Sequence, residues 1–465
     1  MTVYSLSSTL PEDSFVDWTQ TLLWVQGKAP NNSGAQVFFN DTGRNYFVEI
    51  GQGEHISIGS FAVQSNHLVL DGALVSAGSV TVAPGAGIEI YGGALSAQNL
   101  QLQGTPEADL GLVGVGMVTV AGPIYNGSTI IGGNATGLST QTALTLAAAY
   151  VANSGLLEAA VGATLTVAPT LAGGFANYAF GTLTGGSYEA QSGGTLDLKT
   201  NGLVYNDAAT LILDGAGTDV IASFDPSGGH YVPIQSTLGL VTASGTLELD
   251  AAAYATTGTL TVQGLLKLIG EASFTAGTLY LTSGGQAVLS DAYPGFAMTL
   301  SAGRIVNSGR IFVDAAGGGT ATISGPVGGG GSVTLGPAVT TIDKFGQPVT
   351  TTATAELTGA VANSLAYSDG TGTFVLDSPA SVSGSFQHFA AGDRIVLPHI
   401  AASSVTSYSY GGGVLTLQEG SAVQHLAFSG SYTTRDLALG TDSVSGGLTI
   451  TGTSLIGVAP VTHSA

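Results

Sequence analysis

The fold is decided by residues 245–281, where two short patterns each return at a spacing of about 19 residues. Gly245-Thr-Leu-Glu-Leu249 is followed by Gly264-Leu-Leu-Lys-Leu268, and Gly258-Thr-Leu-Thr-Val262 is followed by Gly277-Thr-Leu-Tyr-Leu281. Apolar and polar residues alternate in these segments, which is typical of β-strands with one buried and one solvated face. Two interleaved series with one period indicate more than one strand per repeat. Because so short a repeat cannot bury its own apolar face, successive repeats must stack.

The same spacing appears earlier in the chain. It separates Gly59-Ser-Phe-Ala-Val63 from Gly78-Ser-Val-Thr-Val82, and the segment that begins at Gly162 from the one that begins at Gly181. Glycine at the start of a strand suits a tight corner, where a positive φ is needed. Dividing residues 55–340 by a repeat of about 19–20 residues gives about 14 coils. We therefore predict an all-β chain folded as a β-solenoid with about 19–20 residues per coil.

The ends of the chain depart from the repeat and are expected to close the stack, because open strands template aggregation. The N-terminal part carries both tryptophans, Trp18 and Trp24. We expect them to plug the end of the solenoid; the alternative is that exposed rings stack on sugars. We predict an N-terminal cap at residues 1–54, solenoid repeats at residues 55–345 and a C-terminal β-module at residues 346–465.

Some segments interrupt the periodic pattern. Residues 121–160 and 201–240 lose the register and are expected to form protruding loops. The glycine-dense run from residue 317 to residue 331 is expected to form an elbow towards the end of the stack. Helix signals are almost absent, and Gly155-Leu-Leu-Glu-Ala-Ala160 is the candidate for one or two helical turns.

Composition and charge exclude several function classes. The 465 residues include 71 glycines, no cysteine, and 30 acidic against 9 basic side chains, for a net charge of −21. A nucleic-acid binder needs a basic footprint, and anionic membrane surfaces are disfavoured for the same reason. Without cysteine there is no disulfide, iron–sulfur cluster or thiolate zinc site. No apolar stretch is long enough for a transmembrane helix, and no N-terminal signal peptide is recognisable.

The charged residues do not assemble into a predicted active site. A polysaccharide lyase needs a base beside cations, and a hydrolase needs two close carboxylates. The candidate groups are Glu248 and Asp250 with Lys267, Arg304 and Arg310 with Asp314, and Asp197 with Lys199. Each group is expected to be solvated charge on the outer face of a coil. The histidines lack metal-site spacing, so we predict no catalytic residue, cofactor or metal ion.

Two loops and a set of aromatic residues complete the candidates. Asp393 is expected to form a turn by accepting hydrogen bonds from nearby backbone amides. The segment from Leu213 to Asp219 is a single echo of a calcium-binding repeat and is expected to be a loop. Aromatic residues expected to be exposed, and therefore candidates for a carbohydrate-binding track, are Tyr254, Tyr280, Tyr293, Tyr408 and Tyr410.

Three features together resemble a known group of proteins. The pattern Trp18-x5-Trp24-x2-Gly27-x-Ala29-Pro30 resembles the start of bacterial β-strand-repeat surface proteins of the autotransporter-passenger type. The Gly-x-Leu-x-Leu coils resemble those of filamentous-haemagglutinin-like adhesins. The segment from Gly372 to Thr453, with Phe389-Ala-Ala-Gly-Asp-Arg-Ile-Val-Leu397, is similar to the terminal module of the same group. The resemblance implies a secreted, right-handed parallel β-helix used for adhesion or for surface and matrix structure.

These observations predict a non-enzymatic, extracellular structural or adhesive protein of the bacterial surface or matrix. Its expected partners are further copies of the chain, through self-assembly, or a cell-surface or extracellular polysaccharide. Nucleic acid binding and membrane insertion are not expected. The alternative is a polysaccharide lyase or hydrolase, or a tailspike-like depolymerase, built on the same β-helix.

Overall fold

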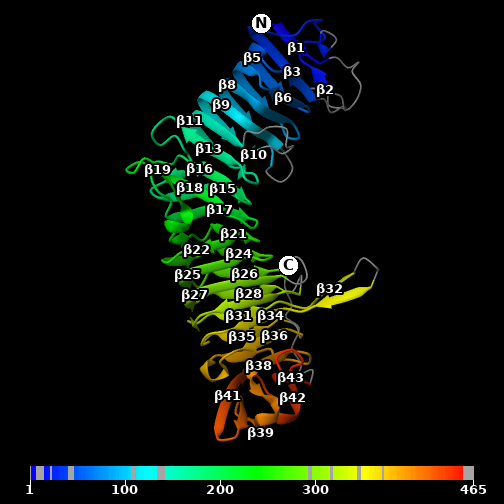
Figure 1. Ribbon diagram of the computed structural model, residues 1–465, viewed down its shortest axis with the longest axis vertical. Helices are drawn as coiled ribbons and strands as arrows, with labels where there is room; N and C mark the ends of the chain where they lie inside the picture. Colours follow the sequence, from blue (N-terminus) through cyan, green and yellow to red (C-terminus); the bar gives the residue numbers. More distant parts are fainter. Residues whose placement is uncertain are drawn as a thin grey trace. The chain divides into compact units, whose positions relative to one another are not determined.

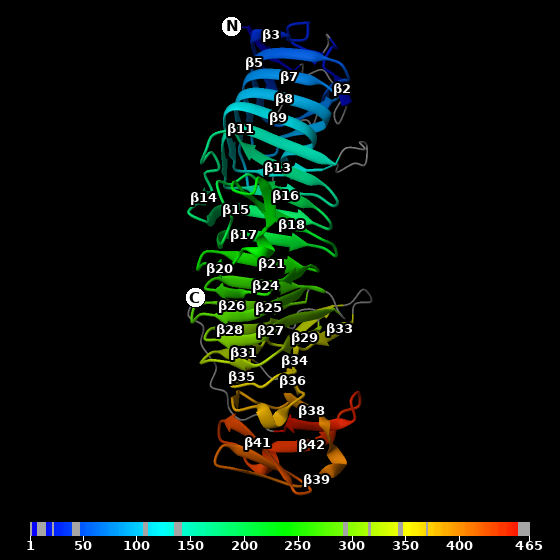
Figure 2. The same cartoon turned by 60° about the vertical axis from the view of Figure 1, so that its left-hand side comes forward.

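Parallel pairing between successive coils organises the chain. The computed structural model describes residues 2–6, 15–20, 23–39, 47–105, 110–133, 142–291, 296–314, 318–342, 347–368 and 371–453. The protein is all-β, with 64% strand and 3% helix, and its parallel coils form a β-solenoid of about 14 turns. The predicted fold class is therefore confirmed. The chain divides into two compact units, Met1–Leu238 and Gly239–Ala465, whose coils are shown in Figures 1 and 2.

The first unit is built almost entirely from parallel strands. Its elements are β1 (Thr2–Ser5), β2 (Phe15–Asp17), β3 (Asn32–Phe39), β4 (Phe47–Ile50), β5 (His55–Val63), β6 (His67–Asp71), β7 (Leu74–Val82), β8 (Gly87–Leu102), β9 (Leu110–Asn126), β10 (Thr129–Gly132), β11 (Ala143–Asn153), β12 (Leu156–Ala159), β13 (Thr164–Pro169), β14 (Tyr178–Ala179), β15 (Thr182–Gln191), β16 (Thr195–Leu198), β17 (Asn206–Asp214), β18 (Val220–Asp225), β19 (His230–Pro233) and the 3-10 helix η2 (Ile234–Ser236).

Coil length varies within this unit. Between β5 and β7 the register advances from His55 to Leu74, which is the spacing that the sequence predicts. Between β9 and β11 the advance is longer, from Met117 to Thr145. Parallel pairing already includes β1, which pairs with β3, and β2, which pairs with β4. The shortest coils thus have the predicted length, and extra residues between strands lengthen the others.

The second unit begins with parallel coils and ends with antiparallel strands. Its elements are β20 (Leu240–Val241), β21 (Thr246–Asp250), β22 (Ala253–Ala255), β23 (Thr259–Val262), β24 (Leu265–Ile269), β25 (Ser273–Leu281), β26 (Gln286–Ser290), β27 (Ala297–Asn307), β28 (Arg310–Asp314), β29 (Thr320–Ser324), β30 (Val327–Gly328), β31 (Ser332–Leu335), β32 (Val339–Ile342), β33 (Pro348–Thr351), β34 (Thr354–Leu357), β35 (Ser364–Tyr367), β36 (Thr373–Leu376), η3 (Pro379–Ser381), β37 (Ser385–Gln387), β38 (Arg394–Ala401), η4 (Ala402–Ser404), β39 (Val405–Gly411), β40 (Val414–Glu419), β41 (Ala422–Ser429), η5 (Thr434–Asp436), β42 (Leu437–Thr441) and β43 (Gly447–Gly452).

The two repeat series seen in the sequence become neighbouring strands of this unit. Strand β21 pairs with β24 and β23 pairs with β25, each in parallel and each with the predicted advance (Thr246 to Leu265, and Thr259 to Thr278). Near the C-terminus, β38 pairs antiparallel with β43, and β40 pairs antiparallel with β39 and β41. The boundaries predicted at residues 54/55 and 345/346 stay predictions.

Alternation of apolar and polar residues along the strands creates the core. In β21, Leu247 and Leu249 are fully buried, whereas Thr246, Glu248 and Asp250 lie on the half-exposed face. The same alternation occurs on most coils, so the inward leucine, valine and isoleucine side chains stack in columns from one coil to the next. Fully burying each such side chain contributes about 1.5–3 kcal/mol.

Glycine has two different roles in the coils. Gly162 and Gly181 have φ values of 63° and 79°, as the corner argument predicts. Gly78 lies within β7, and its φ is not positive. There, a Cβ atom would overlap the carbonyl oxygen of Gly59 on the preceding coil. At this position glycine permits close backbone packing between coils, so the predicted reason is wrong for Gly78.

Three sequence predictions about local structure are wrong. Residues 156–159 form strand β12, not a helix, because they pair in parallel with both β10 and β15. Within residues 121–160, the described parts join the stack as β9 to β12, and residues 206–214 join it as β17. Strand β18 also joins the stack by pairing in parallel with β16, whereas β19, which pairs antiparallel with β18, leaves the parallel arrangement. The described part of the glycine-dense run contains β29 and β30, which pair in parallel with β27.

Candidate functional site

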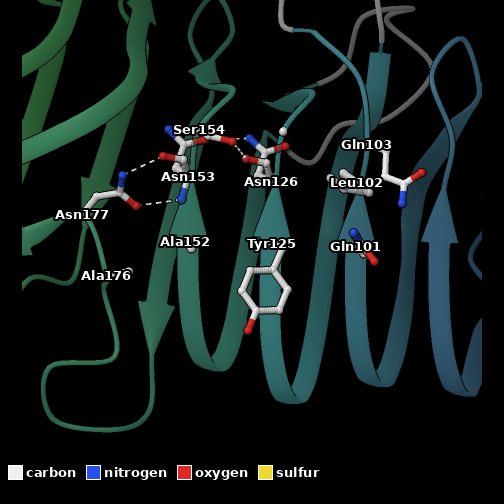
Figure 3. A pocket seen from close by; sticks show the side chains of 11 residues that line it. Gln101, Leu102, Gln103, Tyr125, Asn126, Ala152, Asn153, Ser154, Ala176 and Asn177 are labelled. Atoms are coloured by element: carbon white, nitrogen blue, oxygen red, sulfur yellow. Dashed lines mark hydrogen bonds between the residues drawn. The ribbon is translucent and has the colours of Figure 1, made fainter.

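A groove lies on the first unit where β8, β9 and β11 end (Figure 3). It encloses about 390 Å³. We call it the Tyr125 groove. Its lining consists of amide, hydroxyl, aromatic and small apolar groups from Gln101, Leu102, Gln103, Tyr125, Asn126, Gly127, Ala152, Asn153, Ser154, Ala176 and Asn177.

The register of the strands explains this lining. Tyr125 pairs with Gln101 on one neighbouring coil and with Ala152 on the other, so these three side chains share the outer face. The next residue along each strand turns inward. Asn126 and Asn153 occupy this inward position and pair with each other. The groove therefore has an outer row led by Tyr125 and an inner row of asparagines.

The inner row is held by hydrogen bonds between coils. The Asn126 Nδ2 donates to Asn153 Oδ1 at 2.8 Å and to the Leu156 carbonyl oxygen at 3.0 Å. The Asn153 backbone N–H donates to Asn177 Oδ1, and Asn177 Nδ2 donates to the Asn153 carbonyl oxygen, both at 2.6 Å. Figure 3 shows the three amides in line across neighbouring coils. Because these buried amides are satisfied by one another and by backbone, they form a fixed floor.

The outer row and Tyr150, which lies two residues before Ala152 on β11, present aromatic surface to solvent. The side chain of Tyr125 is 50% exposed and that of Tyr150 is 37% exposed. Their ring centroids lie 6.3 Å apart, with the ring planes inclined by 61°. Gln101 and Gln103 are also exposed at the same edge. An exposed aromatic face beside amides and hydroxyls suits a ligand that has both apolar C–H faces and hydroxyl groups.

The groove carries no charge on its described lining residues. This is notable beside the net charge of −21 for the chain. Repulsion from the acidic surface disfavours a polyanionic ligand, and a cation would find no carboxylate in the groove. The chemistry of the groove therefore matches a neutral saccharide.

A second candidate is a carboxyl pair on neighbouring coils of the same unit. Glu158 on β12 pairs in register with Glu189 on β15. The Glu158 side chain is buried, and burial, together with the charges of Glu189 and Asp214, raises its pKa to about 7. A protonated carboxyl beside an ionised one is the arrangement that glycoside hydrolysis uses.

The structure separates the charged residues that the sequence offered as an active site in the second unit. Glu248 and Lys267 face each other on β21 and β24 and form an ion pair at 3.2 Å. Asp250 pairs with Ile269. The Arg310 guanidinium lies 4.2 Å from the centroid of its neighbour Phe312. Glu248 and Lys267 are therefore bound to each other and Arg310 lies against its own strand, so these charges do not converge.

The remaining charged candidates also have local environments. Asp314 accepts a hydrogen bond from the Ser290 hydroxyl at 3.2 Å. Arg304 lies on β27, where it pairs with Thr278. In the first unit, burial raises the pKa of Asp197 on β16, and Lys199 is exposed one residue past the end of that strand.

The turn predicted at Asp393 is confirmed, and the loop predicted from Leu213 to Asp219 begins only after Asp214, where β17 ends. Asp393 Oδ1 accepts hydrogen bonds from the N–H groups of Thr371 and Gly372, and Oδ2 accepts one from Ala390 at 2.7 Å. The segment before Asp219 connects β17 with β18, and Asp219 Oδ1 accepts the N–H of Gly193 at 2.6 Å. Both carboxylates therefore hold backbone turns.

The tyrosines that were candidates for a carbohydrate-binding track differ in exposure, and Tyr410 is half-exposed with its ring against that of Phe428. Tyr254 is only 1% exposed and stacks inside the core on Phe274, with centroids 5.5 Å apart. Tyr280 and Tyr408 are 39% and 38% exposed. Tyr293 lies outside the described residues. The prediction that Tyr254 is exposed is wrong, because its position on β22 faces inward.

Sequence reasoning missed the groove itself. The steps from Asn126 to Asn153 and from Asn153 to Asn177 are both longer than the predicted repeat, so a search at that period does not connect the three asparagines. A weaker signal was present, since Asn126-Gly-Ser and Asn153-Ser-Gly both place an asparagine before two small residues. Tyr125 precedes the first of these motifs.

Among the described residues, no three histidine, aspartate or glutamate side chains gather into a group able to hold a metal ion. No helix in the described part of the chain is long and apolar enough to cross a membrane. The repeats and the parallel coils define the chain as a β-solenoid repeat protein. No protein-family model matches it, and no curated protein is significantly similar to it.

Proposed function

We propose that the protein is a non-enzymatic, extracellular adhesive β-solenoid that binds a neutral polysaccharide through the Tyr125 groove. The observation that carries the proposal is the exposed pair of Tyr125 and Tyr150 beside the uncharged groove. The ring faces supply stacking surface for sugar C–H groups, and the amides of Gln101 and Gln103 supply donors and acceptors for hydroxyls. The extracellular surface or matrix location follows from the resemblance of the repeats to secreted adhesins.

The shape of the site supports binding to a chain molecule. The outer row runs across successive coils, which lie about 4.8 Å apart. A polysaccharide lying along this row meets a new coil at regular intervals, so weak contacts add along its length. The asparagine floor keeps the coils in register and lowers the ordering cost of binding.

Replacing Tyr125 with alanine should weaken the binding of a neutral polysaccharide at least 10-fold, because it removes the stacking ring. The measurement is affinity electrophoresis or titration calorimetry against neutral glucans, mannans and galactans. The matched control is Tyr280→Ala, which removes a tyrosine of similar exposure from the second unit. The control should bind like the wild type. Equal binding by the wild type and Tyr125→Ala would show that the groove is not the site.

A second candidate function, polysaccharide hydrolysis, rests on the pairing of Glu158 with Glu189. In that reading Glu158 is the general acid and Glu189 is the ionised partner. If this function is correct, the wild type should shorten a polysaccharide, and Glu158→Gln should lower the rate at least 100-fold. Release of reducing ends is the measurement, with Glu248→Gln as a control for removal of a carboxylate elsewhere. A preparation of the wild type that releases none contradicts this candidate.

A further inference from the structure

A β-hairpin stands apart from the stacked coils of the second unit. We call the antiparallel pair of β32 (Val339–Ile342) and β33 (Pro348–Thr351) the hairpin arm. It forms a two-stranded sheet of its own, which Figures 1 and 2 show projecting from the coils. Ile342 is 69% exposed and Val349 is 42% exposed. An isolated two-stranded hairpin is marginally stable in water, so the arm gains from an additional strand.

The two edges of the arm differ in what they can bind. Ile342 pairs with Pro348, and proline has no N–H to donate to its partner. The pair must therefore be of the non-hydrogen-bonded type, in which the backbone groups of both residues point away from each other. Thr340 pairs with Thr350 two residues further along and has the same orientation. Among the described residues, no strand other than β33 pairs with β32. Its outer edge thus offers the N–H and C=O groups of both Thr340 and Ile342, whereas the edge of β33 lacks the donor at Pro348.

The side chains of the arm suit contact with an identical strand. Neither β32 nor β33 contains a charged residue, in a chain with a net charge of −21. Natural edge strands are usually blocked by lysine, proline or a bulge, and β32 has none of these. Its sequence Val-Thr-Thr-Ile consists entirely of β-branched residues, which favour strand pairing.

We propose that β32 pairs antiparallel with β32 of a second copy, so that two hairpin arms form one four-stranded sheet about a two-fold axis. In this arrangement, with the axis at Thr341, Thr340 of each copy faces Ile342 of the other, and the outward N–H and C=O groups of both residues are used. The contact is self-complementary, as a two-fold interface must be. An uncharged strand is also where two strongly acidic chains meet with least repulsion. The proposal is independent of the Tyr125 groove.

The test compares two substitutions at one position. Thr340→Pro removes the outward N–H and the hydroxyl while leaving the backbone hydrogen bonds within the arm intact. Thr340→Ala keeps that N–H and loses the γ-methyl group and the hydroxyl, which lies 2.8 Å from the Thr350 hydroxyl. The mass of each protein is measured by sedimentation equilibrium over a wide concentration range. We expect the wild type and Thr340→Ala to rise from 46.1 kDa towards twice that mass, and Thr340→Pro to stay at 46.1 kDa.

A second variant separates the loss of pairing from any local distortion that proline causes in the arm. Ile342→Lys keeps the backbone donor but places like charges on both copies at the contact, and it should also stay monomeric. Far-UV circular dichroism verifies that each variant retains the solenoid. The proposal is overturned if the wild type stays at 46.1 kDa at every concentration, or if Thr340→Pro and Ile342→Lys associate as the wild type does.

Discussion

Asp207→Asn should stabilise the first unit by about 5 kcal/mol at pH 8 and leave its stability at pH 4 nearly unchanged. Asp207 is completely buried on the inward face of β17, in line with Ala209, Leu211 and Leu213. One carboxyl oxygen accepts the N–H of Ala209 at 2.8 Å. The other oxygen is buried without a hydrogen-bond partner. An ionised carboxylate at this position would be poorly compensated.

The direction of the effect follows from the proton that Asp207 holds. Burial raises its pKa to about 8, against the opposing effect of the Ala209 hydrogen bond. In the unfolded chain, an aspartate has a pKa of about 3.9. The contribution of Asp207 to the free energy of unfolding is therefore most favourable below about pH 4, where the carboxyl is protonated in both states. It is lost as the pH rises towards 8. Asparagine cannot ionise, so it escapes this loss.

Thermal and denaturant unfolding at pH 4, 6 and 8, followed by circular dichroism, measure the effect. Asp225→Asn is the control, because Asp225 lies on the β18–β19 hairpin and hydrogen bonds from Ser227 lower its pKa. This control should show no gain at pH 8. A benefit of Asp207→Asn that is equal at pH 4 and pH 8, or a loss at pH 8, would contradict the assignment.

Trp18→Ala should destabilise the N-terminal coils of the first unit by about 3–5 kcal/mol. Trp18 and Trp24 are 0% and 2% exposed, which confirms that they are buried. The Trp18 ring lies 4.7 Å from that of Trp24 and 5.7 Å from that of Phe61, measured between centroids. Removing the indole leaves a cavity that Trp24, held by its bridge to Leu6, and Phe61, held on β5, cannot fill.

The expected readouts are a lower unfolding midpoint and increased light scattering, because loosened terminal strands expose an edge. Val25→Ala is the matched control, since Val25 is 65% exposed and lies one residue after Trp24. It should change stability by less than about 0.5 kcal/mol. A Trp18→Ala protein as stable as this control would show that the tryptophans do not hold the end of the unit.

The coil architecture was predictable where one alternating strand pattern repeats at one spacing. The segments that begin at Gly245 and Gly264 have no insertion between them, so their alternation predicts the pairing of β21 with β24 directly. The expected number of coils agrees with the observed number of about 14, although for a different reason. Many coils are longer than the predicted repeat, and parallel pairing extends outside residues 55–340 to β1 and β38.

Features that depend on contacts between coils of unequal length could not be predicted. Leu156 to Ala159 have good helix propensity, yet strands on both sides impose an extended backbone. Trp18 and Trp24 were expected to be buried, but strand periodicity does not explain their burial, because Trp18 lies in a turn after β2 and Trp24 forms an isolated bridge with Leu6. The prediction that both side chains are buried is correct, and tertiary contacts are the reason.

The candidate site could not be predicted for the same reason. The long advance between β9 and β11 removes Asn126 and Asn153 from any short period, and only the register brings them together. Asp207 is another case, because alternation alone predicts an apolar residue at its inward position. Site residues are thus found where the pattern is broken, which a search for regular repeats passes over.

The most direct test of the proposed adhesive function follows one polysaccharide through binding and recovery. The wild-type protein is incubated with a neutral polysaccharide that it binds. The polysaccharide is then recovered, and its chain length is measured by size-exclusion chromatography with light scattering. We predict retention that Tyr125→Ala loses, with the chain length unchanged after prolonged incubation. Progressive shortening of the polysaccharide, or the absence of retention by any neutral polysaccharide, would contradict the proposal.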